Sequence, residues 1–385
     1  MKILYDHQAF QMQNFGGVSR CFAEICRHLP DEIEARIALL ESDNAYLKGL
    51  VKVQPKGYQY DHFVCKKHFF AKRHLHQWYD KLTRGHYYPN YNEYHSVMEL
   101  KKGDFDVFHP TFFSDYFLPY LNGKPFVLTI HDMIPELYPQ YFRRDDFQIV
   151  MKRKLAPLAS AIVAVSEKTK QDVVEILGVP EEKVHVVYHG CSFPAVEKGS
   201  EACFDFPYIL YVGQRYGYKN FRLFAKEISS VLKVHEDLYV VCTGTDFTQE
   251  EQMLLQELGV QHRFIHKWVK GDEELGLLYH HAVCFVYPSE YEGFGIPILE
   301  AYKAECLVLL NRASCFPEIA GDAAVYFELN SEHSDLCEQL EYVLKMNTTE
   351  KKQMLEKQRE RLSLYSWEKS AMKMADVYKL VSIPK

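Results

Sequence analysis

Two glutamates, Glu292 and Glu300, stand eight positions apart in the stretch S-E-Y-E-G-F-G-I-P-I-L-E-A, whose residue types could bind an anion. Gly293 and Gly295 free the backbone of a loop, and Pro297 suits the first position of a helix, where its missing N–H leaves nothing unpaired. A helix start offers free N–H groups and the positive end of its dipole to an anion, while carboxylates accept hydrogen bonds from hydroxyls. A nucleotide sugar carries both a diphosphate and hydroxyls, so it would suit this stretch.

A second loop carries two cations that could bind the phosphates of such a ligand. Arg215 and Lys219 follow an apolar, strand-like run over residues 208–212. Fixed positive charge there could stabilise a diphosphate as it departs. Taken alone, each cation could be a solvated loop residue, and each glutamate a surface acid or a helix-dipole partner contributing about 0.3–1 kcal/mol. Taken together, the four charges favour a phosphate-binding site.

The first half of the chain offers three further candidates. Gly16 and Gly17 stand between a strand-like run at residues 2–6 and a helix-like run, where they would let the backbone approach a ligand, although such a pair is often only a turn. His131 follows a buried, strand-like run over residues 125–130, and open α/β sheets bind ligands at the carboxyl ends of their strands. A strand-end histidine bonded to local backbone is an equally compatible interpretation.

The elements that must position these residues alternate between strand and helix patterns along the whole chain. This alternation predicts parallel, doubly wound α/β sheets. Because 385 residues exceed one ordinary core, we expect two domains. Residues 193–207 lack periodicity and predict a linker, which gives domains over residues 1–195 and 205–365 and a last helix within 366–385.

Charge and composition exclude several functional classes. A net charge of −7 argues against a general nucleic-acid binder. The ten cysteines include no C-x-x-C pair, no histidine cluster has zinc-site spacing, and the acids Asp104 and Asp106 are typical of an ordinary strand start, so we expect no metal site. No apolar run approaches membrane-spanning length, and the N-terminus leads directly into a strand, which predicts a cytoplasmic protein.

Residues 64–89 form a basic, aromatic segment within this acidic chain. Asp80 is its one acid, set against Lys66, Lys67, Lys72, Arg73, Lys81 and Arg84. One interpretation is a solvated helical hairpin that buries its aromatic side chains against the domain. The other is an interfacial segment attracted to anionic lipid headgroups, with aromatic side chains at the boundary.

In combination, these motifs resemble family 4 of the retaining glycosyltransferases. The resemblance rests on E-G-F-G-I-P-I-L-E, on Arg215 with K-N at 219–220, on Gly16 and Gly17, and on an S-W helix start at 366–367. The segments F-G-G-V-S-R and H-D-M-I-P are similar to the branch that contains bacterial O-antigen mannosyltransferases. The chain departs from the family pattern at A-E-C-L, residues 304–307, and in the loose turn at residues 311–318.

The resemblance implies a GT-B fold, in which two Rossmann-like domains face a cleft and the last helix crosses back onto the first domain. By family analogy, Glu292 contacts donor-sugar hydroxyls, Glu300 holds ribose hydroxyls from the first turn of its helix, and His131 lies near the anomeric carbon. The residues implied for catalysis are His131, Arg215, Lys219 and Glu292. Those implied for substrate binding are Gly16, Gly17, Gly293, Phe294, Gly295, Ile298, Leu299 and Glu300.

The implied activity is the transfer of a hexose, with mannose as the candidate, from a GDP- or UDP-sugar to a growing surface polysaccharide or lipid-linked glycan. The resemblance implies retention of configuration, and without an acidic ligand cluster we expect catalysis without a metal or another cofactor. We expect a cytoplasmic location, with peripheral association at the inner membrane face through residues 64–89. Two alternatives stay open: a GT-B-like sugar-nucleotide epimerase, which needs no acceptor, and a non-catalytic nucleotide-sugar-binding protein, which shows no turnover.

Overall fold

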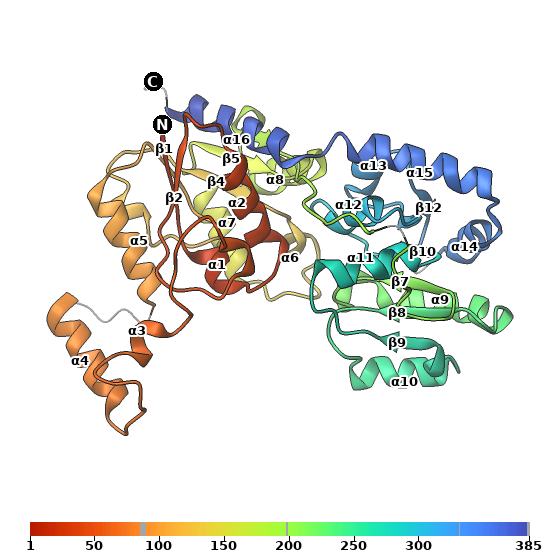
Figure 1. The fold of residues 1–385 in the computed structure, drawn as a ribbon. Helices are drawn as coiled ribbons and strands as arrows, with labels where there is room; N and C mark the ends of the chain where they lie inside the picture. The colour runs from red at the N-terminus through yellow and green to blue at the C-terminus, as the bar shows by residue number, and fades with distance from the viewer. Residues whose placement is uncertain (85–89, 198, 331, 383–385) are drawn as a thin grey trace.

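The computed structural model describes residues 1–84, 90–197, 199–330 and 332–382, which form two α/β units (Figure 1). The chain passes from the first unit to the second near residue 200, and its last helix returns across the first unit. Each unit has a parallel sheet with helices on both faces, as the alternating pattern predicts.

The sheet of the first unit consists of two parallel parts, in the orders β2-β1-β3 and β4-β5-β6. A parallel bridge between Phe108 and Phe126 joins the two parts. The strands are β1 (Lys2–Tyr5), β2 (Glu34–Ile37), β3 (Val107–His109), β4 (Val127–Ile130), β5 (Ala161–Ala164) and β6 (Val184–Val186).

The sheet of the second unit has the parallel order β9-β8-β7-β10-β11-β12. Its strands are β7 (Tyr208–Tyr211), β8 (Tyr239–Cys242), β9 (Phe264–His266), β10 (Cys284–Tyr287), β11 (Val308–Asn311) and β12 (Val325–Phe327). Counted within the unit, this order is that of dinucleotide-binding sheets, with the strand order reversing between β7 and β10. Ligands bind such sheets at the reversal, so the loops that follow β7 and β10 flank the expected binding position.

The helices of the first unit are α1 (Gln8–Met12), α2 (Gly17–His28), α3 (Tyr58–Asp61), α4 (Lys72–Arg84), α5 (Tyr91–Lys102), α6 (Ile134–Leu137), α7 (Phe147–Leu155) and α8 (Glu167–Leu177). Those that follow are α9 (Phe221–Val234), α10 (Gln249–Glu257), α11 (Asp272–His281), α12 (Ile296–Lys303), α13 (Phe316–Ala320), α14 (Leu336–Lys345), α15 (Thr348–Leu362) and α16 (Trp367–Ser382). Short 3-10 helices lie at Ala45–Leu47, Leu118–Tyr120, Glu181–Lys183, Gly217–Lys219 and Gln261–Arg263.

Both faces of each central strand are buried, which explains why these strands are apolar runs in the sequence. Along β7, Ile209 and Tyr211 enter one core of the second unit, whereas Tyr208 and Leu210 enter the core on the opposite face. This alternation follows from the two-residue period of a strand. The sheet is therefore rigidly held, and the loops at its carboxyl edge start from fixed positions.

The last helix, α16, packs against α2 and ties the C-terminal end of the chain to the first unit. The Tyr378 hydroxyl lies 2.5 Å from the Tyr5 hydroxyl and 2.7 Å from His109 Nδ1, so the helix is bonded to β1 and β3. Gly190, in the loop after β6, touches the start of the helix. A Cβ added to Gly190 would lie 2.3 Å from the Trp367 nitrogen.

The Gly190→Ala substitution is therefore expected to lower the melting temperature, because overpacking against backbone costs about 1–3 kcal/mol. Thermal unfolding followed by circular dichroism measures this change. Gly271→Ala is the matched control, since a Cβ at Gly271 meets nothing within 4 Å and its φ of 175° is ordinary extended backbone. Equal melting temperatures for the two variants would contradict the proposed close packing.

The basic, aromatic segment does not bury its apolar side chains as the hairpin interpretation requires. Phe70, Trp78 and Leu82 are exposed, while Lys72 and His76 face the protein. That interpretation is therefore wrong for the side chains of α4. The part of the segment at residues 85–89 lies outside the described residues.

Candidate active site

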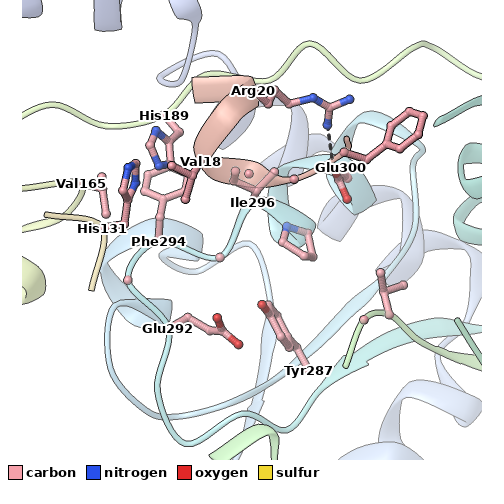
Figure 2. Close-up of a pocket in the computed structure, with 18 of the residues that line it drawn as sticks. Val18, Arg20, His131, Val165, His189, Tyr287, Glu292, Phe294, Ile296 and Glu300 are labelled. Atoms are coloured by element: carbon pink, nitrogen blue, oxygen red, sulfur yellow. Dashed lines mark hydrogen bonds and ion pairs between the residues drawn. The ribbon is translucent and has the colours of Figure 1, made fainter. Parts of the chain in front are cut away.

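A cavity of about 630 Å³ lies between the two units and is lined by residues of both, many of them in loops that directly follow strands (Figure 2). Its lining includes nine predicted site residues: Gly16, Gly17, His131, Lys219, Glu292, Gly293, Phe294, Gly295 and Glu300. The cavity therefore brings together motifs that are spread along the sequence from Gly16 to Glu300.

Two helix starts, one from each unit, face this cavity. The first residues of α2, Gly17 and Val18, lie beside Ile296, the first residue of α12. A Cβ added to Gly17 would lie 3.3 Å from the Ile296 side chain, so the glycine permits this close approach. Because each helix start presents the positive end of its dipole, the pair suits a ligand with several negative charges.

Lys219 and Glu292 form an ion pair inside the cavity, with Lys219 Nζ 2.5 Å from Glu292 Oε1. Both side chains are largely buried, and Lys219 Nζ also lies 5.2 Å from the centre of the Tyr218 ring. A half-buried charge needs a counter-charge. Lys219 and Glu292 therefore supply each other's counter-charge within the cavity.

The glycines of the loop before α12 are required by close contacts. Gly295 precedes the helix with φ 86° and ψ 52°, a left-handed conformation that favours glycine. A Cβ added to Gly293 would lie 1.7 Å from the His131 carbonyl oxygen of the other unit. The Gly293 carbonyl accepts hydrogen bonds from Ser166 Oγ at 2.6 Å and Thr169 Oγ1 at 3.2 Å. This loop is therefore a direct contact between the units.

The start of α12 differs by one residue from the prediction. The helix begins at Ile296, so Pro297 is its second residue and Glu300 begins the second turn rather than lying in the first. This position weakens the interpretation of Glu300 as a helix-dipole partner, because that effect is confined to the first turn. The Glu300 carboxylate instead points into the cavity.

An ion triad at Glu300 joins the two units. Arg20 of α2 donates from Nη1 to Glu300 Oε1 at 3.2 Å and also pairs with Asp272 at the start of α11. The Tyr279 hydroxyl donates to Glu300 Oε2 at 3.4 Å. Burial raises the pKa of Glu300 above its ordinary value, and Arg20 opposes that rise.

Two histidines form the wall that the first unit contributes. The His131 and His189 rings are stacked with centroids 5.9 Å apart, and His189 also packs on Phe294. Burial lowers the pKa of His131 to about 4 and that of His189 to about 3, so both rings are neutral at pH 7. His131 Nε2 is buried and has no hydrogen-bond partner among the described residues, which leaves it free to bond a ligand.

Family models match both units of the chain. Residues 15–192 match the model described as Glycosyltransferase Family 4, and residues 198–361 match the model described as Glycosyl transferases group 1. The chain belongs to glycosyltransferase family 4. The family resemblance that the motifs predict is thereby confirmed.

A curated relative of this family 4 chain is the O-antigen chain mannosyltransferase RfbU of Salmonella typhimurium, 28% identical over 220 residues. The alignment covers 56% of the chain and 60% of the relative, so the chain spans about 60% of the length of that protein. The predicted similarity to O-antigen mannosyltransferases is thus confirmed by the sequence match to one of them.

Solved structures show the fold of this family 4 chain. A glycosyltransferase from Rickettsia africae superposes with a TM-score of 0.67 at 18% identity, covering 100% of the chain and 99% of that structure. Anabaena HepE, solved in complex with UDP and glucose, superposes with a TM-score of 0.67 at 15% identity, covering 99% of the chain and 100% of that structure. The predicted GT-B fold, with two Rossmann-like domains facing a cleft, is confirmed.

Arg215 does not line the cavity of the family 4 chain, contrary to the predicted direct phosphate contact. Its guanidinium donates to the carbonyls of Thr243, Thr245 and Asp246 and to the Glu251 carboxylate. It is buried, because the loop after β7 turns it toward the loop after β8. Arg215 thus braces the two loops that frame one side of the cavity.

Ile298 and Leu299 also lie outside the cavity lining. Both are fully buried and pack in a core of the second unit. The family resemblance implies substrate binding for both residues, but they lie on the core-facing side of α12. Their contribution is to fix the helix whose start faces the cavity.

Sequence reasoning missed Arg20, Asp272 and His189, all of which line the cavity. Arg20 was visible as the last residue of F-G-G-V-S-R, one helical turn after Gly17. His189 follows a strand-like run in the same way as His131. No local signal marked Asp272, because its contact with Arg20 joins the two units.

Proposed function

We propose that this chain is a retaining, metal-independent glycosyltransferase that moves a hexose from a GDP- or UDP-sugar to a glycan acceptor. The observation that carries this proposal is the cavity, where Lys219, Glu292 and Glu300 of one unit face His131 of the other. The name of the Salmonella relative supports mannose as the sugar and a growing surface polysaccharide as the acceptor, and the HepE complex supports a nucleotide donor on this fold.

The proposed roles follow from the geometry. The donor diphosphate lies between the starts of α2 and α12, where it displaces Lys219 from its pair with Glu292. Glu292 is then free to accept hydrogen bonds from hydroxyls of the donor sugar, and Glu300 accepts those of the ribose. His131, neutral at pH 7, bonds the sugar through the unpartnered Nε2 and does not act as a proton carrier.

In the proposed reaction the bond between the anomeric carbon and the diphosphate oxygen breaks, and a bond to an acceptor hydroxyl oxygen forms on the same face. The acceptor proton passes to the departing phosphate oxygen, so no separate protein base is needed. Negative charge develops on the diphosphate during this step. Lys219 and the two helix starts stabilise that charge, which is the role that a divalent cation has in other transferases.

A donor screen tests this function. Thermal shift and slow hydrolysis are measured with GDP-mannose, UDP-glucose, UDP-galactose and UDP-N-acetylglucosamine, each with and without EDTA. We expect stabilisation and slow hydrolysis with one of them. Stabilisation by none contradicts donor binding, and loss of activity on adding EDTA contradicts metal independence. Donor conversion without an acceptor, to an isomeric nucleotide sugar, would instead favour an epimerase.

We further propose that α4 docks the enzyme on an anionic membrane surface, where a lipid-linked acceptor would lie. The helix turns Lys72, His76 and Asp80 toward the protein, one turn apart, and Lys72 donates to the carbonyls of Asp61 and Cys65. The apolar side chains lie on another face. This arrangement inverts that of an ordinary surface helix, whose apolar face is buried.

The exposed apolar face of α4 consists of Leu75, Trp78, Tyr79 and Leu82, between 45% and 69% exposed. Phe70, just before the helix, is fully exposed, and the same segment carries the exposed cations Lys66, Lys67, Arg73 and Lys81. In Figure 1, α4 projects from the first unit on the side away from the second. Apolar side chains flanked by cations are typical of helices that lie in a membrane interface. No helix in the described part of the chain is long and apolar enough to span a bilayer.

Sedimentation with vesicles of phosphatidylglycerol and phosphatidylcholine tests the docking surface. The double substitution Lys66→Glu/Lys67→Glu is expected to weaken binding at least roughly tenfold, because each lysine near an anionic surface contributes about 1 kcal/mol. Trp78→Ser is expected to weaken it as well, whereas Trp268→Ser, which removes an equally exposed tryptophan from the second unit, is the matched control. Equal binding of all variants to the mixed vesicles would contradict the proposal. So would equal binding of the unaltered chain to mixed vesicles and to vesicles of phosphatidylcholine alone.

A further inference from the structure

Arg20, a charged residue of the first unit, pairs with two carboxylates of the second. It lies in the first turns of α2, and its side chain is 9% exposed. It pairs with Glu300 Oε1 at 3.2 Å and with Asp272, and its guanidinium lies 5.0 Å from the centre of the Tyr46 ring. Figure 2 shows the bond that joins it to Glu300 across the cavity.

Glu300 depends on such a partner because it is a buried carboxylate. Removing a carboxylate from water disfavours its charged form unless a counter-charge or hydrogen bonds compensate. Within its own unit, Glu300 receives a hydrogen bond from Tyr279, a neutral donor. The positive charge that faces it comes from the opposite unit, through Arg20.

We propose that Arg20 is a positioning residue for the donor: it holds the Glu300 carboxylate in the orientation that accepts the ribose hydroxyls. This inference rests on the proposed function, since it assumes that Glu300 binds the ribose. Glu300 Oε1 accepts a hydrogen bond from Arg20, whereas the bond from Tyr279 to Oε2 is long, at 3.4 Å, so in this proposal Oε2 is the atom that accepts a ribose hydroxyl. Arg20, a residue of the first unit, then completes the part of the site that binds the nucleoside, although Glu300 belongs to the second unit.

This arrangement couples nucleotide binding to closure of the two units. When the units separate, Arg20 leaves Glu300, and the carboxylate loses its orientation and its counter-charge. A nucleoside diphosphate that bonds to Glu300 therefore binds the closed form more tightly, and so shifts the population toward it. Closure of the two units also brings His131, in the cavity wall formed by the first unit, to the donor.

The pH dependence of nucleotide binding reports on this pair. The titratable or charged groups that face Glu300 are Arg20 and, through it, Asp272, together with Tyr279 and Cys191. Arg20 lowers the pKa of Glu300, which burial raises. Since ribose binding needs the ionised carboxylate, affinity falls as the pH falls through this pKa, and removal of Arg20 moves that loss to higher pH.

The experiment is calorimetric titration of the whole chain with UDP and with GDP between pH 5 and pH 8. For whichever nucleotide binds, Arg20→Ala is expected to weaken binding roughly tenfold to a hundredfold, as loss of a charged hydrogen bond does, and to raise the pH at which affinity falls. Arg20→Lys should restore part of the affinity. In the Glu300→Gln background, Arg20→Ala should have little further effect. Arg359→Ala, which removes an exposed arginine paired with Glu305, is the control.

The outcomes separate this inference from the function on which it rests. Absence of UDP and GDP binding by the unaltered chain overturns both. Normal binding by the unaltered chain with an unchanged or higher affinity in Arg20→Ala overturns the inference alone, because Arg20 would then be absent from the site or would block it. An Arg20 effect that persists with Glu300→Gln also overturns it, because the guanidinium, whose Nε has no partner among the described residues, would then contact the nucleotide itself.

Discussion

Lys219→Ala is expected to lower kcat/KM for sugar transfer by roughly 10²–10³-fold, the range measured when one preorganised stabiliser of transition-state charge is removed. Lys219 is the cation that lines the cavity from the loop after β7, and it lies 2.5 Å from Glu292. Its loss removes positive charge where the departing diphosphate becomes more negative. It also leaves Glu292 without its partner, so the donor meets a repulsive carboxylate. Steady-state kinetics with the donor found in the screen measure the effect.

Two companion variants distinguish catalysis from folding. Lys219→Arg keeps the charge and should retain more activity than Lys219→Ala. Lys226→Ala, on the exposed side of α9 that directly follows this loop, should leave kcat/KM unchanged. The melting temperature is measured for all three. Activity of Lys219→Ala within about threefold of the unaltered enzyme, well below the loss expected for a charge stabiliser, would contradict the assigned role.

The fold could be predicted because its signals are local. Ser166 is of a residue type that caps helix starts and Gly178 of the type that ends helices, and these two residues bound α8. Buried parallel strands read as short apolar runs, and the loops between them carry glycine and polar residues. Both signals reside in the sequence near each element. The inverted orientation of α4 had no such signal, because a helix with apolar residues on one face is expected to bury that face.

The site was predictable where its residues stand in a glycine-bearing loop or directly follow a strand. Glu292, the glycine loop and Lys219 lie at carboxyl ends of β7 and β10, the neighbouring strands at the reversal of strand order. Arg215 lies in the same loop as Lys219, but its side chain points away from the cavity and donates to three backbone carbonyls. The spacing of residues in a sequence does not indicate the direction in which a loop side chain points. Arg20 and Asp272 are 252 positions apart and meet only because the units face each other. Contacts of this kind need the tertiary structure.

The charges within the cavity share one pattern that the sequence does not reveal. Each acid assigned to a sugar is paired with a cation, Glu292 with Lys219 in its own unit and Glu300 with Arg20 from the other. A ligand can replace the contact between Lys219 and Glu292 without any movement of the two units. The contact between Arg20 and Glu300 forms only when the two units lie against each other. With the proposed roles, phosphate binding and ribose binding would therefore differ in their dependence on closure of the two units. The contact that holds the units in this closed arrangement is then decisive.

That contact is Gly293, and Gly293→Ala is expected to lower kcat/KM at least about a hundredfold. The added Cβ would lie 1.7 Å from the His131 carbonyl oxygen, so the units cannot approach as they do here. A misplacement of about 1 Å among reacting groups reduces rates to this extent. The hydrogen bonds from Ser166 and Thr169 to the Gly293 carbonyl would be lost with the contact. Kinetics and small-angle scattering measure the loss of activity and the expected rise in radius of gyration.

Gly259→Ala provides the comparison, because Gly259 has a φ of 73° and a Cβ there meets nothing within 4 Å. Alanine in this left-handed conformation strains the backbone far from the cavity, so it should lower the melting temperature and leave kcat/KM unchanged. Gly293→Ala should show the opposite balance, since each unit keeps its own core and only their approach is altered. If Gly293→Ala retained full activity with an unchanged radius of gyration, the closed arrangement would not be the catalytic one. If both variants lost stability and activity in parallel, the effect of Gly293 would lie in folding rather than in the joining of the two halves of the site.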